Sequence, residues 1–77
     1  MLATILKELR LQRGGFSTLT AAATALDVRH SAISRWESGD RRPTGQNLAY
    51  LLQRYGCSKR ERDKAWAAFR AEWEGTL

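Results

Sequence analysis

The sequence predicts an all-α domain built from five helices. Apolar residues recur at the three- and four-residue spacing of a helix along nearly the whole chain. No stretch alternates apolar and polar residues with the β-branched enrichment typical of a strand. The length of 77 residues suits one domain with a small core, because so short a chain buries only about 60% of its unfolded surface.

The first two helices are expected on either side of a glycine-containing loop. The inward face of the first consists of Leu2, Ile5, Leu6 and Leu9. Gly14-Gly15 ends this helix, and Thr18 is placed to cap the next one. The inward face of the second helix consists of Leu19, Ala22, Ala23 and Leu26.

The third helix is expected from Arg29 to about Ser38, with Ile33 and Trp36 facing the core. Gly39 is placed to end it in the left-handed conformation. Only two or three residues separate it from the second helix, whose small alanines let the two axes approach closely. This arrangement predicts a helix-turn-helix unit.

The last two helices have clear start and end signals. Thr44 is placed to cap the fourth helix, and Gly56 to close it. Ser58 and Glu61 have the spacing of a capping box at the start of the fifth. The apolar face of the fourth helix consists of Leu48, Leu51, Leu52 and Tyr55. That of the fifth consists of Ala65, Trp66, Phe69 and Trp73.

The charge balance is basic and uneven. The net charge is +5, with ten Lys or Arg against four Asp or Glu in residues 1–60 (+6) and three against four in residues 61–77 (−1). We therefore expect an acidic partner to meet the first three-quarters of the chain. No apolar run approaches the ~20 residues that cross a bilayer, so no membrane role is expected.

The outer face of the third helix is rich in hydrogen-bond donors. The residues left there are Arg29, His30, Ser31, Ser34 and Arg35. Arginine can bond to O6 and N7 of guanine, serine can bond to any base, and a helix fits the major groove of DNA. The face therefore either reads base edges or is an ordinary solvated helix surface.

Residues around the third helix favour the first interpretation. Candidate contacts to the DNA backbone near this helix are Arg41, Arg42, Thr44 and Gln46. Such contacts would set the position of the protein on the duplex. The alternatives are a solvated loop for the two arginines and a cap with no further role for Thr44; capping and DNA contact can coexist.

The stretch "LTAAATALDVRHSAISRWESGDRRP" resembles the helix-turn-helix of the Cro and phage-repressor family, also called the XRE family. The matching features are a small residue in the second helix, the Ile-Ser-Arg-Trp-Glu run at residues 33–37, Gly39, and a basic loop ending at Pro43. The resemblance spans about residues 5–56, and more loosely extends into the last helix. It implies a compact five-helix fold like that of the lambda repressor.

The resemblance implies three functional features. The family reads bases with early positions of the third helix, which correspond to the five residues of the donor-rich face. It often pairs an arginine of the first helix with the glutamate after the tryptophan, here Arg10 and Glu37; the alternative is two solvated charges. It usually binds a palindromic operator in double-stranded DNA as a homodimer, with recognition helices about 34 Å apart.

The sequence also departs from the family pattern. Leu19 stands where a phosphate-binding glutamine is common in the family, so that backbone contact is either missing or supplied by Thr18 or Thr20. Asp27 replaces the usual glycine of the turn. His30 has no partner at metal-ligand spacing, so no metal or other cofactor is expected; it either contacts DNA or is an exposed bystander. The aromatic stripe Trp66, Phe69 and Trp73 either packs on the core or forms a dimer contact.

We expect a sequence-specific DNA-binding regulator, most simply a repressor, with a helix-turn-helix core at residues 1–57 and a C-terminal helix at residues 58–77. The single cysteine permits no internal disulfide and fits a reducing, intracellular setting. With the family resemblance, the expected location is the cytoplasm of a prokaryotic cell or phage-infected host. An antitoxin or adaptor that acts by binding another protein is the alternative. The sequence contains no paired carboxylates, Cys–His arrangement or phosphate-binding loop that would indicate an enzyme.

Overall fold

The computed structural model describes the backbone of residues 1–75 and the side chains of residues 1–72. In that part of the chain there are five helices and no strand. The helices are α1 (Leu2–Gln12), α2 (Leu19–Leu26), α3 (His30–Ser38), α4 (Gly45–Tyr55) and α5 (Lys59–Gly75). The predicted all-α class and the order of the helices are therefore confirmed.

The predicted N-caps of α2, α4 and α5 and the glycine end of α3 are also confirmed. The hydroxyls of Thr18 and Thr44 each accept a hydrogen bond, 3.1 Å long, from the backbone amide three residues later. Ser58 and Glu61 form the reciprocal bonds of a capping box, at 2.8 and 3.2 Å. Gly39 has a φ of 83°, which an L side chain rarely adopts, and it ends α3 sharply before the basic loop.

The helices enclose one small core, to which every helix contributes. Its buried members are Leu2, Leu6, Leu9, Ala22, Ala23, Leu26, Ile33, Trp36, Leu48, Leu51, Leu52, Tyr55, Cys57 and Ala65. Among the helices, α5 contributes least, with Ala65 fully buried and the rings of Trp66 and Phe69 partly so. The core therefore rests mainly on α1 to α4.

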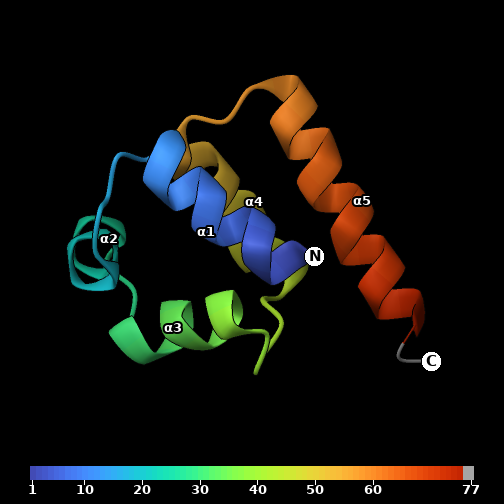
Figure 1. The fold of residues 1–77 in the computed structure, drawn as a ribbon, viewed down its shortest axis with the longest axis horizontal. Helices are drawn as coiled ribbons and strands as arrows, with labels where there is room; N and C mark the ends of the chain where they lie inside the picture. Colours follow the sequence, from blue (N-terminus) through green and yellow to red (C-terminus); the bar gives the residue numbers. More distant parts are fainter. Residues whose placement is uncertain (76–77) are drawn as a thin grey trace.

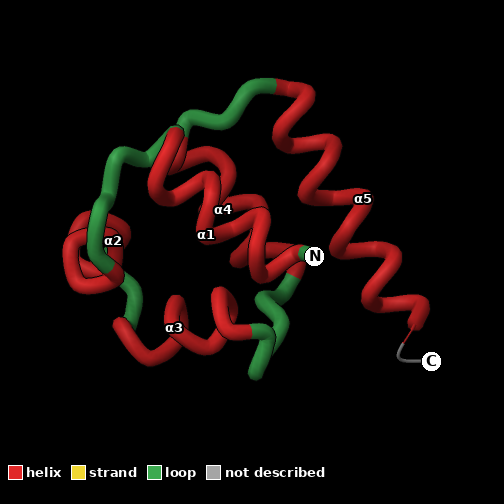
Figure 2. Tube along the Cα trace, viewed as in Figure 1, coloured by secondary structure: helices red, strands yellow, loops and turns green. Residues whose placement is uncertain are grey.

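The packing places α3 at one edge of the molecule. It contacts both α1 and α2, whereas α5 packs on α1 along the opposite flank (Figure 1). Short loops join α2 to α3 and α3 to α4 (Figure 2). In the α2–α3 turn, Asp27 adopts the left-handed conformation, with φ 56° and ψ 44°. An aspartate can occupy the glycine position of this turn, but at a cost in backbone strain.

Candidate nucleic-acid interface

The two faces of α3 differ sharply in exposure. Ile33 and Trp36 are only 1% and 9% exposed and fix one side of the helix in the core. Ser31 and Arg35 lie on the opposite side and are exposed to solvent. Ser34 is half-buried. The helix therefore presents a narrow polar face that is held in place by two large apolar side chains.

The start of this helix differs from the prediction. The helix was expected to begin at Arg29, but that residue is its N-cap, with an extended backbone (φ −69°, ψ 137°). The first helical residue is His30, and both residues are exposed. Arg29 is not a cap of the usual kind, because its side chain has no oxygen to accept a backbone bond.

A shallow hollow of about 370 Å³ separates α3 from the first turn of α4. Its lining consists of Arg29, Ser31, Ala32, Arg35, Trp36, Arg41, Arg42, Thr44 and Asn47. It brings together six of the ten predicted DNA-contacting residues. The other four, His30, Ser34, Thr18 and Gln46, do not line it; Thr18 caps α2 and Gln46 is an exposed residue of α4.

Asn47 is a lining residue that sequence reasoning missed. It is exposed, and its backbone amide donates to the capping hydroxyl of Thr44. It lies in the same turn as that cap and is one of the residues that line the hollow. The signal available in the sequence was its spacing of three residues from Thr44.

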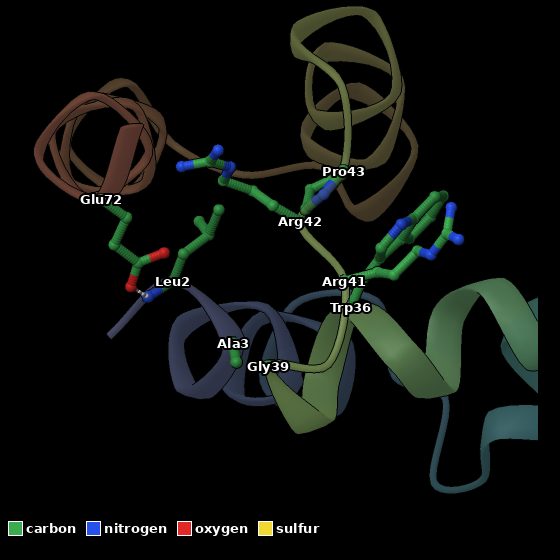
Figure 3. A pocket seen from close by; sticks show the side chains of 8 residues that line it. All are labelled: Leu2, Ala3, Trp36, Gly39, Arg41, Arg42, Pro43 and Glu72. Carbon is green, nitrogen blue, oxygen red and sulfur yellow. Dashed lines mark hydrogen bonds between the residues drawn. The ribbon is translucent and has the colours of Figure 1, made fainter. Parts of the chain in front are cut away.

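The two arginines of the basic loop point in different directions (Figure 3). Arg41 lies beside the Trp36 ring, on the side of the loop that faces α3. Arg42 extends the other way, toward α5, and is partly buried. Pro43 is buried between them and α4, which fixes the path of the loop. The loop therefore offers the α3 side chiefly one cation.

A second, smaller hollow of about 190 Å³ lies on the side of the loop nearer α5 (Figure 3). There the carboxylate of Glu72 accepts a hydrogen bond, 2.9 Å long, from the backbone amide of Leu2. This bond ties the distal part of α5 to the first residue of α1, where free amides favour a negative charge. Thus α5 reaches the neighbourhood of the basic loop without contributing to the exposed face of α3.

The structure brings Arg10 and Glu37 together beneath α3. Nε and Nη2 of Arg10 donate to the two oxygens of Glu37 at 2.8 and 3.0 Å, and Nη1 donates to the carbonyl of Phe16 at 2.9 Å. Both side chains are nearly inaccessible, at 5% and 8% exposure. This bidentate pair links α1, the loop before α2, and α3, so it holds α3 to the core.

The buried ion pair sits beside a perturbed phenol. The pKa of Tyr55 is raised to about 12, mainly by burial and in part by the Glu37 carboxylate, while Arg10 opposes the rise. The ring of Tyr55 also packs against Phe16, with centroids 6.3 Å apart. Tyr55 is therefore neutral at physiological pH, and its buried ring lies near the ion pair of Arg10 and Glu37.

On α5, Trp66 and Phe69 form an edge-to-face pair with centroids 5.5 Å apart, and both pack against the core. The third member of the predicted stripe, Trp73, has a side chain outside the described residues. The packing of the first two on the core leaves each ring only partly exposed.

The model of a family described as "Helix-turn-helix domain" matches residues 2–65, which is most of the chain. The chain belongs to the helix-turn-helix domain family. The predicted resemblance to that class of DNA-binding proteins is therefore confirmed.

This helix-turn-helix chain also resembles a curated protein, the HTH-type transcriptional regulator DicA of Escherichia coli (strain K12). The two are 39% identical over 56 residues, which is 71% of this chain and 42% of DicA. The chain thus spans less than half the length of that relative. No solved structure matched.

Among the described residues of the helix-turn-helix chain, no helix is long and apolar enough to cross a membrane. Nor do those residues contain a cluster of three or more His, Cys, Asp or Glu side chains able to hold a metal ion.

Proposed function

We propose that this chain binds double-stranded DNA in a sequence-specific manner and regulates transcription, as a repressor, with α3 in the major groove. The observation that carries the proposal is the hollow beside α3. Its polar lining is basic and accessible, while Ile33 and the nearly buried Trp36, which also borders the hollow, anchor the same helix in the core. A helix held this way can enter a groove without losing its packing.

The exposed face of α3 supplies the proposed base contacts. Ser31 and Arg35 are one helical turn apart and project to the same side, which suits reading of neighbouring base pairs. His30 and Arg29 lie at the end of the helix and extend the contact along the groove. We place Ser34 at the margin, because it is half-buried.

The flanking residues supply the proposed backbone contacts. Arg41 and Thr44 lie along one wall of the hollow, and the first turn of α4 has free backbone amides that suit a phosphate. Thr18 and Gln46 are exposed at the starts of α2 and α4. Arg42 borders the hollow but extends toward α5, so we assign Arg41 the larger share of phosphate binding.

The proposed assembly is a homodimer on a palindromic operator, in the cytoplasm of a prokaryotic cell or phage-infected host. A two-fold dimer would place two copies of α3 about one duplex turn, 34 Å, apart. The helix-turn-helix core of residues 1–57 would bind each half-site. The C-terminal helix of residues 58–77, with Trp66, Phe69 and Trp73, would supply part of the dimer contact.

Selection of bound sites from a random DNA pool tests this proposal directly. The expected result is a palindromic consensus, which would establish both sequence reading and two-fold symmetry. Recovery of no preferred sequence would overturn the proposed function. A consensus without a repeat would retain DNA reading and reject the dimer.

Two alanine variants then separate base reading from backbone binding. Arg35→Ala is expected to weaken binding to the selected site by roughly 1–3 kcal/mol and to leave binding to random DNA nearly unchanged. Arg41→Ala is expected to weaken both about equally and to reduce the salt dependence by about one phosphate contact. The matched control is Arg60→Ala, an exposed arginine in the first turn of α5, a helix that lies on the opposite flank of the molecule from α3 (Figure 1). Equal loss on both DNAs for Arg35→Ala would contradict its assignment.

A further inference from the structure

The C-terminal end of α2 has a donor for each of its last four carbonyl groups. Two of the donors are backbone amides: Asp27 donates to Thr24 at 3.3 Å and Val28 to Ala23 at 3.1 Å. The last carbonyls of a helix have no partner within the helix, so a local turn of this kind satisfies only some of them. The carbonyls of Ala25 and Leu26 need other donors.

Those donors are side chains of α4. The hydroxyl of Tyr50 donates to the carbonyl of Leu26 at 2.7 Å, and Nη2 of Arg54 donates to the carbonyl of Ala25 at 3.3 Å. Tyr50 and Arg54 are four residues apart and so lie on one face of α4. The Tyr50 bond is the shorter, and it ends on the residue directly before the α2–α3 turn.

The turn that follows is strained. Asp27 is the one non-glycine residue with a positive φ in the described part of the chain. The left-handed conformation is less favourable for aspartate than for glycine, because aspartate carries a Cβ. An external hydrogen bond to the preceding carbonyl would help to hold the chain in this conformation, from which Val28 and Arg29 lead directly into α3.

We infer that Tyr50 is a positioning residue for DNA recognition: its hydroxyl fixes the carbonyl end of α2 and thereby the angle at which α3 is presented. Arg54 assists at the neighbouring carbonyl. The inference rests on the proposed function, because it concerns how that function is set up. It gives α4 an indirect role in recognition, in which Tyr50 acts without contacting a base or a phosphate.

Tyr50→Phe tests the inference, since it removes the hydroxyl and keeps the ring. The expected result is a loss of affinity for the selected site on the order of threefold to tenfold, with little change on random DNA. Hydrogen exchange is expected to accelerate at the amides of Asp27 and Val28 and not in α1 or α5. The matched control is Tyr55→Phe, whose hydroxyl belongs to the buried side of α4.

A second substitution makes the test specific for positioning. Asp27→Gly removes the strain of the turn, so the double variant Tyr50→Phe/Asp27→Gly is expected to recover most of the lost affinity. A purely structural role for Tyr50 would instead lower the thermal midpoint, speed exchange throughout the chain and leave the ratio of specific to random binding unchanged. That outcome, or unchanged exchange at the turn, would overturn the inference.

The two proposals can fail separately. If the native chain selects no DNA sequence, the proposed function fails, while the exchange measurement still reports on the turn. If the native chain is selective and Tyr50→Phe is equally selective, only the positioning role fails.

Discussion

Two arginines near the end of α1, Arg10 and Arg13, each form an ion pair with a glutamate. The two pairs differ in burial, in geometry and in the helices that they join. Arg10 makes a bidentate contact with Glu37 and a third bond to a backbone carbonyl, with both side chains at most 8% exposed. Arg13 reaches Glu61 through Nε alone, and its side chain is 51% exposed. The first pair joins α1 to α3, and the second joins the end of α1 to the start of α5.

The comparison indicates that burial matters more than distance for the contribution of an ion pair to stability. The shortest contacts of the two pairs are nearly equal, at 2.8 and 2.7 Å. In the buried pair, loss of one partner leaves a charge without water or counterion, which is costly. In the exposed pair, water replaces the partner, and salt screens the attraction. We therefore expect the buried pair to hold α3 in position and the exposed pair to contribute little to stability.

The largest expected effect comes from breaking the buried pair on one side. Arg10→Met leaves the Glu37 carboxylate buried and unpaired, and the expected loss is about 3–5 kcal/mol of the free energy of unfolding. Small domains have only about 5–15 kcal/mol in total, so much of the chain would unfold. The measurement is urea unfolding followed by far-ultraviolet circular dichroism.

The double variant Arg10→Met/Glu37→Leu is the control for this prediction. It removes both charges and fills the space with apolar groups, so it is expected to recover most of the stability. If the double variant were as unstable as the single one, the loss would come from packing around Arg10 and not from a stranded charge.

Most of the fold could be predicted from the sequence because its signals are local. Capping residues such as Thr18, Thr44 and Ser58, and the left-handed glycine after α3, specify helix ends within a few residues of where they stand. Apolar spacing specifies the inward faces independently of the tertiary arrangement. The start of α3 was misplaced by one residue because arginine is an unusual N-cap and gives no such signal.

The site was less predictable, because its details depend on which helices meet. Nothing local to "DRRP" distinguishes Arg41, which faces α3, from Arg42, which faces α5. The bonds from Tyr50 and Arg54 to α2 cross 24 and 29 residues of chain. Asn47 borders the hollow only because the loop returns α4 to the side of α3. These contacts depend on how the helices pack together, and helical periodicity alone does not predict them.

A smaller effect is expected at alkaline pH from the phenol next to the buried pair. The folded-state pKa of Tyr55, about 12, lies above its ordinary value of 10.0. The folded chain therefore holds this proton more tightly than the unfolded chain, so the associated stability is complete below pH 10 and is lost as the pH rises toward 12. Urea midpoints measured between pH 9 and roughly 11.5 are expected to fall more steeply for the native chain than for Tyr55→Phe. Parallel slopes would show that this phenol titrates alike in both states.

The smallest effect is expected at the exposed pair, and it sharpens the comparison because the same residue types are involved. The hydrogen bond from Arg13 lowers the pKa of Glu61 below its ordinary value of 4.5. Its contribution is present above that value and fades as the pH falls through the lower folded-state pKa. Arg13→Ala is expected to shift the thermal midpoint at pH 7 by no more than the error of the measurement, and added salt should remove any difference from the native chain. A loss of stability that persists at high salt and is comparable to that of Arg10→Met would contradict this prediction. It would mean that the pair holds α5 against α1 and that exposure does not determine its contribution to stability.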